Sequence, residues 1–247
     1  MSALLGAELI KLRTTRTFAA LAGVAVGTSL LITVLVASLT EPTPDSVLTD
    51  VFLSDTSGLF VTILAIVGIT GEWRHRTITS SLLAAPHRVR FLAAKTLAYA
   101  IAGLVLAALI WIAVTAIGYA IIVVRDLPRP DGGELAELAT RNVAVALLPG
   151  AFGVGMGAVL RNPAVAIVTL LVLAFLVEPT LQALAPDVAR FGPTSALPIA
   201  VAGIDPEDAG LGDLDLLPAG IALLALLAWI GALFALGAAL LRGRDLD

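Results

Sequence analysis

Six long apolar runs constrain the fold of this chain more than any other feature. They cover residues 18–39, 51–70, 97–124, 142–160, 164–184 and 217–241. A helix needs about 20 apolar residues to cross about 30 Å of hydrocarbon, and the runs meet this requirement. The third run is longer than a crossing needs, so we expect it to tilt or protrude. The pattern predicts an all-α, polytopic membrane protein with six transmembrane helices in a single domain, residues 1–247.

The shortage of charge agrees with this fold class. Charged residues make up 14% of the 247 residues and hydrophobic residues 59%, whereas a soluble domain carries about 25% charge. The first run is not a signal peptide, because its apolar part is too long and further runs follow. The chain has no cysteine, which excludes disulfides and thiolate metal sites.

The segment before the first run, residues 1–16, is short and amphipathic. Leu5, Leu9 and Leu12 share one helical face. The basic residues of the segment are Lys11, Arg13 and Arg16. Such a helix prefers the headgroup plane of a membrane. We expect an interfacial elbow helix; the alternative is a frayed N-terminus whose basic residues stay on the inner side.

The distribution of basic residues predicts the topology. Six crossings place both termini on one side of the membrane. Eleven Lys and Arg then lie on the side of the termini and four on the opposite side. Cytoplasmic loops of membrane proteins carry the excess of Lys and Arg. We therefore expect both termini in the cytoplasm.

The densest basic segment, residues 71–95, follows the second run. It holds seven of the chain's seventeen Lys, Arg and His, so it is expected to stay cytoplasmic. Ile78, Leu82 and Ala85 fall on one helical face, and Pro86 follows at once. The spacing predicts a short helix over residues 77–85, lying across the inner mouth of the protein.

This segment resembles the first cytoplasmic loop of ABC-2-type transporter permeases. The family pattern is Glu, a basic pair, Thr, an apolar stretch, Leu-Leu, a small pair, Pro, and then Arg and Lys. The matching residues here are Glu72, Arg74, Arg76, Thr77, Ile78, Leu82, Leu83, Pro86, Arg88 and Lys95. Many members have Gly before the Thr, where this chain has Arg76. The resemblance extends to the elbow, the six runs and a broken external segment at residues 185–216.

The resemblance implies a permease subunit of a bacterial ATP-binding cassette exporter in the cell membrane. Two permease subunits, identical or different, would pair and form the translocation pathway. Two separate ATPase chains would bind beneath them, and residues 71–95 would be the coupling segment that docks into an ATPase cleft. The expected coupling residues are Glu72, Arg74, Arg76, Thr77, Leu82, Leu83, Pro86, Arg88 and Arg90. Without the resemblance, Glu72 would be an interfacial ion pair with nearby Arg, worth about 0–1 kcal/mol.

No catalytic chemistry is readable in the chain. The phosphate-binding pattern G-x-x-x-x-G-K-[ST] does not occur. His75 and His87 lie in the basic segment without a carboxylate cluster, so we expect no metal site. We predict that the chain is not an enzyme and holds no cofactor, and that ATP and Mg²⁺ belong to the ATPase partner. Nothing indicates nucleic acid as a partner; the lipid bilayer is the other expected contact.

Two further features lie inside the apolar runs. Glu178 is an acid in an apolar run, which makes it a functional hypothesis by default. It is either a gate or substrate contact, or a cap at the bend that Pro179 makes into an external re-entrant segment. The second feature is two small-xxx-small pairs, which predict helix packing. These pairs are Gly23 with Gly27 and Gly153 with Gly157.

Two other functions compete with ATP-driven export. A secondary transporter driven by an ion gradient would want charges deep in several spans and usually inverted repeats. The chain offers Glu178 alone and no obvious repeat. A non-transporting membrane scaffold is the third possibility. A neighbouring gene with a phosphate-binding motif would favour the exporter.

Overall fold

The computed structural model describes residues 2–43, 46–52, 56–79 and 87–243, and it confirms the predicted fold class. In these ranges the regular elements are helices, and six helical stretches are long and apolar enough to cross a membrane. The stretches are Arg16–Leu39, Val47–Arg74, Arg88–Arg125, Gly132–Leu160, Pro163–Leu184 and Ala219–Leu241. The chain is therefore all-α, with six candidate transmembrane helices.

Several of these stretches are built from more than one helix. The first half of the chain contains α1 (Ser2–Thr14), α2 (Arg16–Leu39), α3 (Val47–Phe52), α4 (Ser57–Arg74) and α6 (Arg88–Arg125). The second half contains α7 (Gly132–Val145), α8 (Leu148–Leu160), α9 (Pro163–Val172), a π-helix (Leu173–Val177) and α10 (Glu178–Leu184). The chain ends with α11 (Pro186–Ala189), α12 (Ala196–Ala202) and α13 (Ala219–Gly243).

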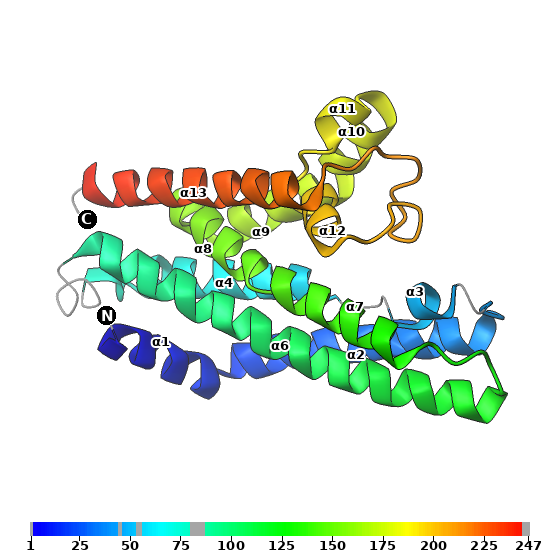
Figure 1. Cartoon of the computed structure of the whole chain (residues 1–247). Helices are drawn as coiled ribbons and strands as arrows, with labels where there is room; N and C mark the ends of the chain where they lie inside the picture. The colour runs from blue at the N-terminus through cyan, green and yellow to red at the C-terminus, as the bar shows by residue number, and fades with distance from the viewer. Residues whose placement is uncertain (1, 44–45, 53–55, 80–86, 244–247) are drawn as a thin grey trace.

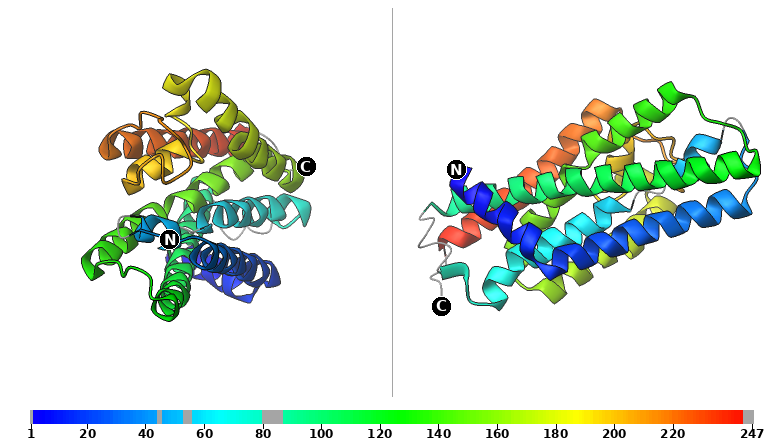
Figure 2. Two further views of the ribbon diagram at one scale, coloured as in Figure 1. Left: turned by 90° about the vertical axis from the view of Figure 1, so that its right-hand side faces the viewer. Right: turned by 90° about the horizontal axis from the view of Figure 1, so that it is seen from below.

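Helices α4 and α8 form the centre of the bundle. Helix α8 packs against α4, α6 and α13, and its side chains are mostly buried. Helices α1, α2 and α6 lie on one side of this pair and α13 lies on the other (Figure 1). The end-on view in Figure 2 shows the same separation. The apolar windows of α2, of α9–α10 and of α13 are each only 17% buried, so their outer faces are available to lipid or to a partner subunit.

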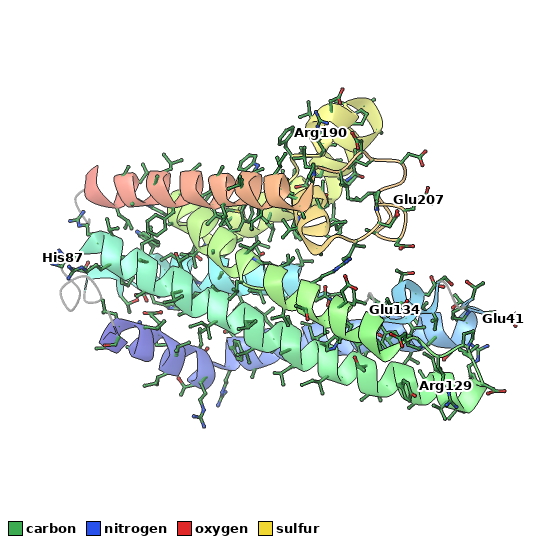
Figure 3. The ribbon with its side chains drawn as sticks, viewed as in Figure 1. Glu41, His87, Arg129, Glu134, Arg190 and Glu207 are labelled. Carbon is green, nitrogen blue, oxygen red and sulfur yellow. The ribbon has the colours of Figure 1, made fainter. Side chains whose placement is uncertain are left out.

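The bundle has two chemically different ends. Helix α1 and the C-terminal end of α13 lie at one end, which we call the terminal end (Figure 1). Figure 3 places His87 at this end. The opposite end is called the distal end. The labelled residues toward it are Glu41, Arg129, Glu134, Arg190 and Glu207 (Figure 3).

Two helix boundaries differ from the sequence prediction. Helix α6 begins at Arg88 and has 38 residues, about 57 Å at 1.5 Å per residue. The second half of the expected coupling segment is thus the first turns of a long helix rather than a loop. Helix α7 begins at Gly132, ahead of the apolar run that starts at residue 142, because the Asp131 carboxylate caps it by accepting from Gly133 N at 2.8 Å.

The π-helix lies directly before Glu178 and Pro179. Pro179 has no N–H, so it cannot donate to the preceding turn. The Glu178 N–H instead bonds to the Leu173 carbonyl, five residues earlier. The expected interruption of the fifth run at Glu178-Pro179 therefore takes the form of a local widening, and the helix continues to Leu184.

The two small-residue pairs lie in very different surroundings. A Cβ at Gly157 would overlap the side chain of Ile69, and one at Gly153 would stand 2.8 Å from Ala65 Cβ. These glycines let α8 approach α4 closely. Gly23 and Gly27 have no atom within 4 Å of a Cβ position and lie on the exposed face of α2. The helix contact expected for this pair is not made within the described chain, because α2 turns other residues toward its neighbours.

Substitution by leucine should distinguish the buried glycine pair of α8 from the exposed pair of α2. Gly157→Leu is expected to lower the free energy of unfolding by about 1–3 kcal/mol, because α8 must move away from α4. Gly27→Leu, the matched exposed change, is expected to cost less than about 0.5 kcal/mol. Thermal unfolding of the detergent-solubilised protein measures both, and equal shifts would contradict this packing.

Candidate functional site

Four charged side chains meet at the terminal end and form the ion cluster: Glu8, Lys11, Glu72 and Lys95. Lys95 Nζ lies 2.7 Å from Glu8 Oε2 and 3.0 Å from Glu72 Oε1. Lys11 Nζ lies 3.1 Å from Glu8 Oε1 and 3.3 Å from Glu72 Oε1. Each carboxylate therefore contacts both ammonium groups, and the four formal charges cancel.

The ion cluster joins three helices that are distant in the sequence. Glu8 and Lys11 come from α1, Glu72 from the last turn of α4, and Lys95 from the third turn of α6. Lys95 is 1% exposed, and Glu8 and Glu72 are each 6% exposed. Apolar side chains surround the cluster, among them Leu12 and Leu92. Charges in such a setting stay ionised only when they are paired, so the three helices are held to one another.

Lys11 is the solvent-facing member of the ion cluster. Its side chain is 51% exposed. Partial burial would lower its pKa, but the Glu8 and Glu72 carboxylates outweigh burial and raise the pKa above the ordinary 10.5. Lys11 therefore remains protonated at physiological pH.

The expected coupling segment, residues 71–95, leaves α4 directly from the ion cluster. Thr77 Oγ1 donates to Glu72 Oε2 at 2.8 Å, and Thr77 N donates to the Glu72 carbonyl at 2.9 Å. Arg76 lies between them with φ of +55°, a left-handed conformation that favours glycine. The departure from the family pattern thus falls at a position where the backbone itself prefers Gly. Ile78 begins a new helical turn and is buried.

The other end of the expected coupling segment is also anchored. The Arg88 guanidinium donates a hydrogen bond through Nη1 to the carbonyl of Leu241, near the end of α13. Arg90, in the first turn of α6, is exposed. Leu82, Leu83 and Pro86, and most of the predicted helix 77–85, lie outside the described residues. The described flanks therefore tie the segment to α1, α4, α6 and α13.

Exposed cations surround these anchors. We call them the terminal basic surface: Arg13, Arg16, Arg74, Arg76 and Arg90. Glu72 does form ion pairs, as the alternative to the coupling role supposed, but they are with Lys11 and Lys95 and they are buried. The arginines are left facing solvent, where they are available to a partner.

Glu8 and the structural role of Lys95 were not predicted from the sequence. A usable signal existed for each. Lys95 stands among apolar residues of a long helix, and a charge in that setting requires an acidic partner. Glu8 is the one acid before residue 41, and it lies between Leu5 and Leu12, on the face that the chain buries.

Glu178, the first residue of α10, is 1% exposed. Its Oε1 accepts from Thr194 N at 2.9 Å, and its Oε2 accepts from the Ser195 hydroxyl. A Cβ at Gly192 would stand 2.8 Å from the same carboxylate. In this arrangement the side chain caps the turn that leads into α12 rather than a bend at Pro179, where the helix continues to Leu184.

Removal of this cap should loosen the turn. Glu178→Gln replaces one acceptor oxygen with an NH2 group, so the acceptor of the Ser195 hydroxyl is lost. Amides of residues 192–203 are expected to exchange with deuterium about tenfold faster, as measured by mass spectrometry. Glu207→Gln, an exposed change in the same part of the chain, is the control and should leave the rates unchanged. Unaltered exchange in Glu178→Gln would contradict the cap.

Comparison with known proteins adds no assignment. No protein-family model matches the chain, and no curated protein matches it. The residues of the terminal end therefore carry the functional argument.

Proposed function

We propose that this chain is the permease subunit of an ATP-binding cassette exporter, lying in a bacterial cell membrane with both termini in the cytoplasm. It would supply half of the translocation pathway, and a separate ATPase subunit would supply the energy. The second permease subunit would be another copy or a related chain. The observation that carries the proposal is the ion cluster, which ties the start of the coupling segment to three helices.

The arrangement suits the transmission of force. A push on residues 77–85 would reach Thr77 and then Glu72, which is bonded to Thr77. Lys95 would carry the displacement into α6, and Glu8 would carry it into α1. Because buried paired charges hold a fixed geometry, the three helices would move as one body rather than slide.

The charges of the two ends support the proposed orientation. The terminal basic surface is cationic, and positive residues concentrate on the cytoplasmic side of membrane proteins. An ATPase with an acidic cleft would find its partner through these arginines. Complementary charge chiefly raises the association rate and fixes the register of a complex.

Purification in mild detergent from the native host tests the proposal. We expect an ATPase subunit to co-purify with the permease at equal stoichiometry, and the complex to hydrolyse ATP. A permease that purifies alone under all conditions would count against the assignment.

Buried Glu178 favours a gradient-driven transporter instead. That function predicts transport by proteoliposomes that contain neither nucleotide nor ATPase. Such transport would replace the present proposal.

A further inference from the structure

The distal half of the bundle contains a cavity of about 550 Å³. Helices α4, α8 and α12 and the π-helix contribute to its wall. The wall is mostly apolar and includes the aromatic rings of Phe152 and Phe175. Its volume lies within the range of small-molecule sites, about 300–1,000 Å³. None of the four residues of the ion cluster lines this cavity, so the two are separate features.

A smaller hollow of about 310 Å³ adjoins the cavity, and the two share Ile204 and Asp208. We call it the acidic hollow, because four carboxylates line it: Glu134, Glu137, Asp205 and Asp208. Arg141 also lines it, but its guanidinium is paired with Glu137 and donates to the Gly203 carbonyl at 2.8 Å. The lining residues thus carry an excess of negative charge.

A further carboxyl group, that of Glu178, lies behind the cavity wall. Thr194 and Ser195 line the cavity, and the Thr194 N–H and the Ser195 hydroxyl bind the Glu178 carboxylate. No ion pair joins Glu178 to a Lys, Arg or His in the described part of the chain. The Thr194 Oγ1 and Asn142 Nδ2 atoms, also from lining residues, are buried without a hydrogen-bond partner among the described residues. A polar group on a ligand could bind there.

We infer that the cavity and the acidic hollow together bind an amphipathic organic cation. Its apolar body would fill the cavity, and its cationic group would face Asp208, which belongs to both spaces. Phenylalanine rings attract cations through their faces, whereas an anion would meet the carboxylates of the acidic hollow. That this ligand is transported rests on the proposed function; that it binds here does not.

Tetraphenylphosphonium and tetraphenylborate are suitable probes, because they share a shape and differ in charge. Equilibrium dialysis measures their binding to the purified full chain in detergent, without the ATPase. Saturable binding of tetraphenylphosphonium is expected, and tetraphenylborate should bind at least about tenfold more weakly.

Substitution of one carboxylate then locates the site. Asp208→Asn is expected to weaken tetraphenylphosphonium binding about three- to tenfold, the effect of one charge a few ångströms from the cation in a wet environment. Asp213→Asn removes another exposed carboxylate, one that lines neither space, and it should leave the affinity unchanged. Both positions are exposed, so both variants should fold.

Three results would overturn the inference: no saturable binding of the cation, equal binding of the two probes, or equal weakening by the two substitutions. The assay contains no ATPase, so its failure leaves the permease assignment standing. Conversely, a chain that binds the cation but never associates with an ATPase would retain this site and lose the proposed function.

Discussion

Lys95→Met is expected to lower the free energy of unfolding by about 3–5 kcal/mol, because it leaves Glu8 and Glu72 buried without their inner partner. Methionine keeps the length and the apolar stem of lysine, so the loss is mainly electrostatic. For a chain of this size the midpoint of thermal unfolding should fall by about 10 °C. Circular dichroism of the detergent-solubilised protein measures this midpoint.

Lys11→Met is the matched control for this variant. Lys11 contacts the same two carboxylates, but its side chain is half-exposed and water can replace it. We expect a loss of about 1 kcal/mol or less. The double variant Lys95→Met with Glu8→Gln restores the charge balance and should be more stable than Lys95→Met alone. Equal losses for the two lysine variants would show that burial does not govern the ion cluster.

Arg74→Ala combined with Arg76→Ala is expected to weaken association with the ATPase subunit at least about tenfold. Each arginine is exposed on the terminal basic surface, and a charged contact across an interface is worth about 1 kcal/mol or more. Neither side chain belongs to the ion cluster, so membrane insertion and the unfolding midpoint should change little. Co-purification and stimulated ATP hydrolysis are the measurements.

Two controls separate charge from backbone in that experiment. Arg129→Ala removes one exposed arginine at the distal end (Figure 3) and should leave association unchanged. Arg76→Gly removes one charge but relieves the left-handed backbone at φ +55°. The Arg76→Gly variant should be at least as stable as the wild type. Its affinity for the ATPase should lie between that of the wild type and that of the double variant. Normal recruitment and turnover in the double variant would refute the docking role.

The six crossings could be predicted from the sequence because they depend on length and apolarity alone. The start of helix α7 could not be predicted from length and apolarity. Its first turns are amphipathic, and its start is marked by Asp131 followed three residues later by Glu134, a local capping signal that hydropathy does not detect. For Gly23 and Gly27 the sequence predicted a helix contact that the described chain does not make. The spacing was correct for packing, but the rotation of α2 about its axis depends on tertiary contacts.

The ion cluster could be predicted only in part. Glu72 was identified from the family resemblance, yet its partners come from positions 61 and 23 residues away in the chain. Those pairings arise from the packing of α1 against α6, which no local pattern specifies. The Glu178 cap is similar, because the turn at Thr194 returns to it only after α11. Buried charges could be listed from the sequence, but their partners required the fold.

The proposal depends most directly on which side of the membrane each end of the bundle faces. The chain has no cysteine, so single-cysteine variants can be labelled without further changes. Arg90→Cys reports on the terminal end and Glu207→Cys on the distal end, where both native side chains are exposed. A membrane-impermeant maleimide added to intact cells should label position 207, and should reach position 90 only after the membrane is opened. Labelling of position 90 from outside would contradict the account.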